Sequence, residues 1–154
     1  MRKKKSRLLS VDKNYMPASE NEDDELFPNG IFVFNITKMV EYVRKHRDEM
    51  PLESIEVKEY TRGLSVLTES HIDKTDITAP LILAEISPSR YNVIDGNHRL
   101  EKAYRMGVDH MTADKLKPEQ HMPFLTSLKA YHIYIEYWNS KVKDMERLAK
   151  QKAL

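Results

Sequence analysis

The chain of 154 residues contains no cysteine, one tryptophan and only four glycines. Without a thiolate it cannot carry out thiol-based redox chemistry. No apolar run approaches the ~20 residues that span a bilayer, and no apolar segment follows the basic start of the chain to make it a signal peptide. We therefore expect a cytoplasmic protein with no membrane partner.

Common catalytic and metal-binding motifs are missing as well. The sequence has no Walker A loop, no HExxH pair and no EF-hand loop. Its six histidines are scattered, and only His98 lies in a context that suggests function. A functional site must therefore be recognised from a less common pattern.

Charge is spread unevenly along a chain whose net charge is only +1. Residues 2–7 carry five basic side chains, and residues 20–25 carry five acidic ones. This polar start, with little periodicity, predicts a disordered charged tail over residues 1–25. The rest of the chain divides into one domain over residues 26–122 and a C-terminal helix over residues 123–154.

Hydrophobic periodicity predicts strands and helices along the domain. Runs of β-branched and aromatic residues bounded by turn residues predict strands, and apolar residues at three- and four-residue spacing predict helices. Residues 64–78 fit neither pattern clearly. The predicted strands are 30–34, 54–60, 79–86, 91–94 and 111–116, and the predicted helices are 36–47 and 97–106.

A single apolar stripe follows residues 123–154 and predicts one long helix. Three heptads make a short coiled-coil seam, so we expect this helix to pack on its own domain. A homodimer through the helix is the alternative. The stripe consists of Leu128, Tyr131, Ile135, Trp138, Val142, Met145 and Ala149.

The most informative stretch is Tyr91–Gly107, which has the pattern of a short strand, an Asp-Gly turn and a helix. Gly96 allows a sharp turn and a close approach of a ligand to the backbone. The first turn of the helix offers unpaired N–H groups and the positive end of the helix dipole. His98 and Arg99 add a titratable donor and a permanent cation there. Together these features predict a phosphate-binding site.

A simpler interpretation is that Asp95 or Asn97 caps an ordinary amphipathic helix. A cap does not explain why His98 and Arg99 both occupy the first turn, where the helix dipole disfavours positive charge. A bound anion would compensate this charge, and we favour the phosphate site for that reason.

The order of elements from Pro80 to Gly107 resembles the core of the ParB/sulfiredoxin superfamily. The shared pattern is a Pro-led strand, a short turn, a second strand and a Gly-x-x-Arg helix, which here is Gly-Asn-His-Arg at residues 96–99. The match covers roughly residues 80–116, about a quarter of the chain. The resemblance implies an α+β fold in which helices flank a small mixed sheet, with the long C-terminal helix added to it.

The resemblance also implies a ligand. Partition proteins of the ParB type use the Gly-x-x-Arg element to hold nucleotide phosphates, which implies a nucleoside triphosphate, ATP or CTP, here. Such a ligand is commonly accompanied by Mg²⁺, held by phosphate oxygens and a carboxylate. The candidate nucleotide contacts are Gly96, Asn97, His98, Arg99 and Arg90, and the candidate metal ligand is Asp95.

The sequence leaves the type of activity open. Sulfiredoxins carry a reactive cysteine at the position of Asn97, so their chemistry is excluded. An enzyme, whether a phosphotransferase, an NTPase or a nuclease, would use His98, Glu85 or Glu101 as its catalytic group, whereas a binding module would use the nucleotide to switch a surface. A DNA-binding or nuclease member of the ParB-like family is the alternative, favoured by the basic start of the chain and opposed by its near-neutral net charge.

Overall fold

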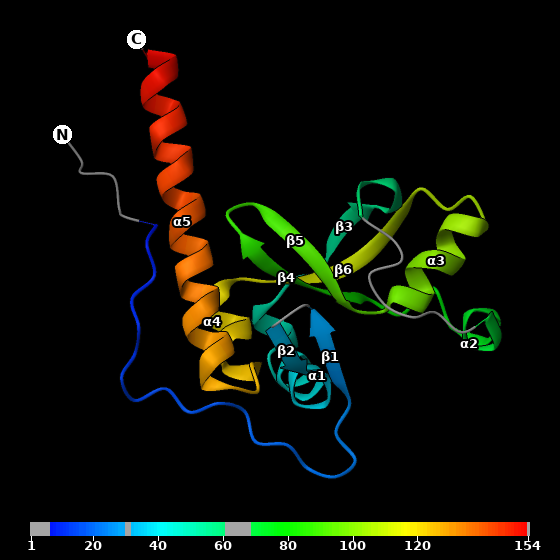
Figure 1. Ribbon diagram of the computed structural model, residues 1–154. Helices are drawn as coiled ribbons and strands as arrows, with labels where there is room; N and C mark the ends of the chain where they lie inside the picture. The colour runs from blue at the N-terminus through cyan, green and yellow to red at the C-terminus, as the bar shows by residue number, and fades with distance from the viewer. Residues whose placement is uncertain (1–6, 30–31, 61–68, 154) are drawn as a thin grey trace.

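The computed structural model describes residues 7–29, 32–60 and 69–153 of the chain. These residues form a mixed α+β fold with two small sheets and a long C-terminal helix (Figure 1). The α+β class predicted from the sequence is confirmed. The strands are β1 (Leu26–Asn29), β2 (Phe32–Asn35), β3 (Glu53–Glu56), β4 (Leu81–Ser87), β5 (Arg90–Asp95) and β6 (His110–Leu116), and the helices are α1 (Ile36–Lys45), α2 (Glu69–Lys74), α3 (Asn97–Arg105), α4 (Pro118–His121) and α5 (Leu128–Ala153).

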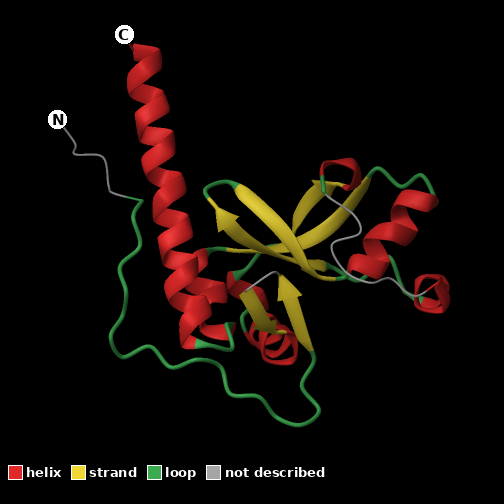
Figure 2. Cartoon of the chain, viewed as in Figure 1, coloured by secondary structure: helices red, strands yellow, loops and turns green. Residues whose placement is uncertain are grey.

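The larger sheet has the strand order β3-β6-β4-β5, and the smaller sheet pairs β1 with β2 (Figure 2). In the larger sheet β4 runs parallel to β6, while β3–β6 and β4–β5 are antiparallel. This is the small mixed sheet expected from the sequence. The β4–β5 hairpin and β6 lie where strands 79–86, 91–94 and 111–116 are predicted.

Other elements differ from their predicted bounds. The strand predicted over residues 54–60 ends at Glu56, because a 3-10 turn that buries Val57 follows it. Helix α3 agrees with the prediction and stops before Gly107, whose φ is +74°. The ambiguous stretch 64–78 contains α2, with residues 64–68 outside the described chain, and residues 30–31 of the first predicted strand are likewise outside it.

The larger sheet separates two apolar cores, because alternate residues of a strand point to opposite faces. On one face Leu83 and Val93 pack with Leu100 of α3. On the other face Ile82 and Ile94 pack with side chains from α1, β2 and α5. The junction between β5 and α3 is therefore held by packing on both sides of the sheet.

Residues 7–25 follow an extended course along α5 and then α1 (Figure 1). The side-chain amide of Asn139 pairs with both backbone groups of Leu9, at 2.8 and 2.9 Å. Tyr15 stacks on Tyr131 with the ring centroids 3.7 Å apart. The composition predicts a disordered tail here, whereas these contacts define a path for it. Several of them are made to backbone groups, which composition does not reveal.

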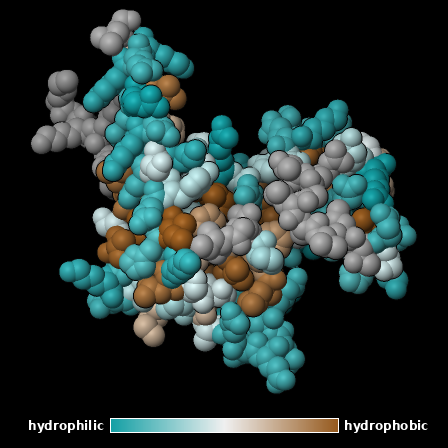
Figure 3. Space-filling model, in the orientation of Figure 1, coloured by the Kyte–Doolittle hydropathy of each residue, from teal (hydrophilic) through white to brown (hydrophobic). Residues whose placement is uncertain are grey.

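Helix α5 packs on the domain along its first half only. Tyr131, Trp138 and Val142 are buried, whereas Met145 is 42% exposed, and every described residue after Val142 is exposed. This end of the helix projects beyond the body and is mostly hydrophilic (Figures 1 and 3). Neither α5 nor any other helix in the described ranges is long and apolar enough to cross a bilayer.

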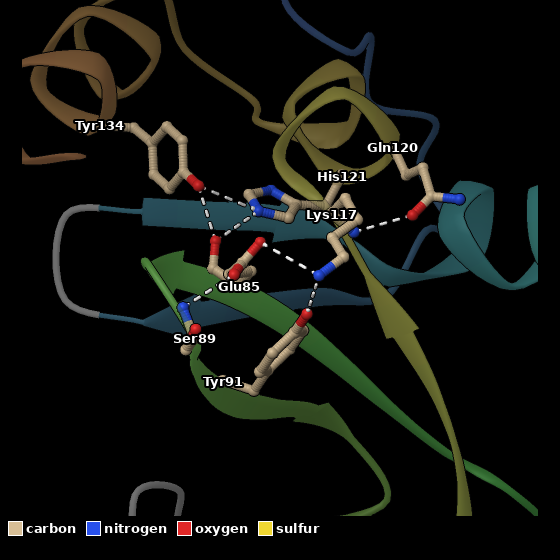
Figure 4. A network of polar contacts seen from close by, with 7 residues as sticks. All are labelled: Glu85, Ser89, Tyr91, Lys117, Gln120, His121 and Tyr134. Carbon is tan, nitrogen blue, oxygen red and sulfur yellow. Dashed lines mark hydrogen bonds and ion pairs between the residues drawn. The ribbon is translucent and has the colours of Figure 1, made fainter. Parts of the chain in front are cut away.

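A buried polar network joins β4 to α4 and α5 (Figure 4). The carbonyl oxygen of Glu85 accepts hydrogen bonds from the Tyr134 hydroxyl at 2.6 Å and from Nε2 of His121 at 2.8 Å. Because a carbonyl can only accept, Nε2 carries the proton of the neutral imidazole. Burial lowers the pKa of His121 to about 4, so the ring stays uncharged at neutral pH.

Because His121 is buried in its neutral form, the protein should lose stability in mild acid. The unfolded imidazole takes up a proton near pH 6.5, and the folded imidazole only near pH 4. Lowering the pH across this window should therefore decrease the free energy of unfolding by about 3 kcal/mol. Urea unfolding at a series of pH values measures the change. His121→Gln should remove this part of the pH dependence, and the same dependence in that variant would contradict the assignment; the exposed His132→Gln is the control.

Candidate functional site

Gly96 forms the turn between β5 and α3, with a φ of +101° in the left-handed region. L residues seldom adopt this conformation. A Cβ at this position would lie 2.5 Å from Cδ2 of Leu81 and 2.7 Å from Nη2 of Arg99. The sequence suggests that Gly96 lets a ligand approach, and the structure adds a nearer reason: the turn itself has no room for a side chain.

The first turn of α3 begins without a side-chain cap. The N–H of Leu100 donates to the carbonyl of Gly96 at 2.9 Å, so the N–H groups of residues 97–99 have no acceptor within the helix. The side chain of Asn97 points inward and donates to the carbonyl of Val93 at 3.3 Å. The alternative that Asp95 or Asn97 merely caps the helix is therefore wrong, and the turn has the donors that an anion needs.

Arg99 lies against the start of β4. Its Nη2 donates to the carbonyl of Pro80 at 2.8 Å and lies 3.4 Å from Oδ2 of Asp95. Its Nε is buried without a partner among the described residues. The contact with Asp95 is longer than a usual charge-assisted hydrogen bond, so the guanidinium is held in place while its charge is only partly compensated.

A pocket of about 220 Å³ lies between α2 and the start of α3, and we call it the α2–α3 pocket. The rings of His71 and His98 meet edge to face there, with centroids 5.5 Å apart. Lys74 and Arg99 add fixed positive charge, and Asp95 is the one acid among the described lining residues. The lining consists of His71, Lys74, Thr75, Asp95, Gly96, His98 and Arg99. This composition favours an anionic ligand.

A second pocket, of about 210 Å³, lies beside α1 and also contacts Asp95 and Arg99; we call it the α1 pocket. Its Arg47 is fixed by the buried carboxylate of Asp114, with contacts of 2.6 and 3.0 Å. Hydrogen bonds from Arg47 to Asp114 raise the pKa of the Arg47 guanidinium. The lining consists of Val40, Val43, Arg44, Arg47, Ala79, Pro80, Ile82, Asp95, Arg99 and Asp114. Apolar walls and fixed cations therefore lie together.

Two basic residues of α3 hold α2 in place rather than facing a ligand. Nζ of Lys102 donates to the carbonyls of Asp73 and Thr75, at 3.0 and 2.9 Å. Arg105 pairs with both carboxylate oxygens of Glu69, at 2.7 and 3.0 Å, and these bonds lower the pKa of Glu69. Side chains of α3 therefore fix the position of α2, which forms the opposite wall of the pocket.

Four residues proposed from the sequence line neither pocket, and Asn97, whose side chain points inward, is one of them. Glu85 is at the far end of β4, where its carboxylate lies 3.8 Å from Nζ of Lys117 (Figure 4). Arg90 opens β5 beside α5, and Glu101 pairs with Arg105 at 3.1 Å. These positions do not fit a catalytic role for Glu85 or Glu101, or a nucleotide contact for Arg90.

Sequence reasoning missed several lining residues. His71 and Lys74 belong to the stretch that fits no clear pattern, and Arg44 and Arg47 read only as the basic end of a predicted helix. The packing of α1 and α2 around the β5–α3 junction brings them to Arg99. The one sequence feature that could have indicated these lining residues is the run of basic residues that follows the apolar positions of α1.

Asp95 is the candidate metal ligand, and it lines both pockets. Within the described ranges, no three His, Asp or Glu side chains are grouped so that they could hold an ion. Mg²⁺ bound to a nucleotide takes most of its ligands from phosphate oxygens and water, with one or two carboxylates. Asp95 therefore fits a Mg²⁺ that arrives with a phosphate ligand, and not a site made by protein alone.

Comparisons of the chain with protein-family models, curated proteins and solved structures found no match. The resemblance to the ParB/sulfiredoxin superfamily stays a prediction.

Proposed function

We propose that the chain binds a nucleoside triphosphate, ATP or CTP, with its phosphates at the first turn of α3. The observation that carries this proposal is the set of donors around the α2–α3 pocket. Lys74, His98 and Arg99 line it, and α3, which starts at this pocket, begins without a side-chain cap. A helix N-terminus with nearby cations suits a phosphate chain.

The size of the pockets supports a ligand that occupies both. Pockets for small molecules usually enclose roughly 300–1,000 Å³, and neither pocket reaches this range alone, at about 220 and 210 Å³. The two share Asp95 and Arg99 and reach the range together. We assign the phosphates to the α2–α3 pocket, and the base and ribose to the α1 pocket with its apolar Val43, Pro80 and Ile82.

The same geometry suits either a binding module or an enzyme. His98 is the one proposed catalytic residue that lines the pocket, where it could transfer a proton while Arg99 stabilises developing charge. Asp95 would hold Mg²⁺ together with phosphate oxygens. Released phosphate or a phosphorylated acceptor would assign an NTPase or a phosphotransferase, and tight binding without turnover would assign a nucleotide-gated module.

Thermal melting with ATP, CTP, GTP, UTP and ADP, each with Mg²⁺, tests the proposal. A ligand at 100 times its dissociation constant stabilises the folded state by about 2.7 kcal/mol, which corresponds to a shift of several degrees for a protein of this size. We expect such a shift for ATP or CTP. No shift with any of the five at millimolar concentration would contradict the proposal.

DNA binding, with or without nuclease activity, is the second candidate, because the same cations could contact a polynucleotide backbone. Arg44, Arg47, Lys74 and Arg99 all line the two pockets. A polynucleotide that contacts them should bind with an affinity that falls steeply as salt increases. We expect a single-stranded oligonucleotide to compete poorly with ATP or CTP. Strong competition that disappears at high salt would favour DNA binding.

A further inference from the structure

A cleft of about 280 Å³ lies between the tip of the β4–β5 hairpin and α5, and we call it the hairpin cleft. It is at the opposite end of the hairpin from α3 (Figure 1). Pro88 and Arg90 line it from the hairpin, and Tyr137 and Leu148 line it from α5. Ser87 also belongs to the lining and is only 5% exposed, so the cleft reaches down to a buried residue.

Both walls of the hairpin cleft are fixed by Glu85 (Figure 4). The hydroxyl of Tyr134, about one turn before Tyr137 on α5, donates to the carbonyl oxygen of Glu85 at 2.6 Å. The carboxylate of Glu85 accepts the backbone N–H of Ser89, at the tip of the hairpin, at 2.8 Å. Because these bonds join the hairpin to α5 and hold its tip, the cleft is preformed, and a ligand need not order its walls.

The charged groups of the hairpin cleft are positive on balance. Arg90 and Lys141 line it, and neither forms an ion pair with any residue that the structure describes. Asp144 is the one acid among the described lining residues, and it lies 3.8 Å from Arg147 of the same helix. Nζ of Lys141 lies 5.3 Å from the centre of the Tyr137 ring. An anionic group in the cleft would therefore compensate two cations.

The remaining surface of the hairpin cleft is largely apolar. Tyr137, Met145 and Leu148 line it and are 40%, 42% and 48% exposed. In Figure 3 the projecting end of α5 shows a hydrophobic patch on the side nearer the sheet. A small inorganic anion would leave this surface in water, and an uncharged apolar molecule would leave Arg90 and Lys141 without a counter-charge. The cleft therefore suits a molecule that has both an anionic group and an apolar body.

We propose that the hairpin cleft binds a small aromatic carboxylate. Its carboxylate pairs with Arg90 and Lys141, and its ring lies against Tyr137 and Met145, since aromatic rings and thioether sulfur both make favourable contacts with an aromatic ring. Pockets for drug-sized ligands enclose roughly 300–1,000 Å³, so a cleft of about 280 Å³ limits the ligand to a smaller molecule. The proposal does not depend on nucleotide binding, because the hairpin cleft shares no lining residue with the α2–α3 and α1 pockets.

Titration of the whole ¹⁵N-labelled protein with 2-naphthoate, followed by nuclear magnetic resonance, tests the proposal. We expect saturable shifts centred on the backbone amides of Ser89, Arg90, Lys141 and Met145, with a dissociation constant of about 1 mM or lower. 2-Naphthamide has the same rings without the charge, and acetate has the charge without the rings. Each should bind at least about tenfold more weakly than 2-naphthoate, and ATP with Mg²⁺ should not displace 2-naphthoate.

Three variants identify the cations that hold the carboxylate. Arg90→Gln and Lys141→Gln each remove one positive charge from a side chain outside the buried core, so the fold should persist while the dissociation constant for 2-naphthoate rises at least about fivefold. Lys143→Gln makes the same change at an exposed position of α5 outside the cleft and should leave the affinity unchanged. Absence of binding at several millimolar, equal affinities for 2-naphthoate and 2-naphthamide, shifts centred on residues 97–99, or an affinity that neither cleft variant changes would each overturn the proposal.

Discussion

Replacing Arg99 with alanine should lower the affinity for nucleotide by about 100-fold. The guanidinium lines both pockets and lies at the turn that we assign to the phosphates. The change also removes the hydrogen bond to the carbonyl of Pro80, which should cost about 1 kcal/mol of folding stability. Affinity must therefore be measured directly, by calorimetric titration at a temperature where the variant is fully folded.

Arg90→Ala provides the matched control. It also removes an arginine, but one at the start of β5 that lies beside α5 and outside both pockets. We expect its nucleotide affinity to equal that of the wild-type protein. Equal affinities for the wild-type protein and the folded Arg99→Ala variant would refute the assignment of the phosphate site, and a loss confined to Arg90→Ala would move the site to the other end of the hairpin.

Gly96→Ala should destabilise the fold by about 2–5 kcal/mol. A positive φ costs an L residue roughly 1–2 kcal/mol, and forcing an extra methyl group into packed surroundings costs typically another 1–3 kcal/mol. The new Cβ would lie 2.5 Å from Cδ2 of Leu81, a buried side chain that cannot move freely. Urea unfolding monitored by far-UV circular dichroism measures the loss.

Gly107→Ala separates the backbone cost of a positive φ from the steric cost of an added Cβ. Gly107 also has a positive φ, of +74°, but a Cβ there would have no neighbour within 4 Å among the described residues. Its replacement should therefore cost only the backbone part, roughly 1–2 kcal/mol. Similar losses at the two glycines would show that the contacts with Leu81 and Arg99 contribute nothing to the requirement for glycine at position 96.

The sequence predicted the elements whose signals are local. The β4–β5 hairpin, α3 and β6 follow from alternating or helical apolar spacing and from Gly107 at the helix end. The path of residues 7–25 was not predictable, because Leu9 is held through its backbone groups by Asn139, a residue 130 positions away. Composition carries no information about such a contact.

Only the part of the site that comes from one turn of the chain could be predicted, because contacts between distant residues leave no local signal in the sequence. Gly96, His98 and Arg99 lie within four residues of one another, so a single turn brings them together. Arg47 and His71 reach the α1 pocket and the α2–α3 pocket, which share Arg99, only through the packing of the chain around the β5–α3 junction. Glu85 looked close to the site in sequence, but the extended strand β4 carries it to the opposite end of the hairpin. Proximity in sequence means proximity in space in a helical turn and not along a strand.

Nuclear magnetic resonance of the ¹⁵N-labelled protein can locate the phosphate-binding residues one by one. On titration with ATP or CTP and Mg²⁺, we expect saturable shifts that are largest at the backbone amides of residues 97–99 and extend to Lys74. The amides of Glu85 and Arg90, at the far end of the hairpin, should hardly move. Saturable shifts centred on any other part of the chain, or none at millimolar nucleotide, would contradict the proposal that the first turn of α3 binds the phosphates.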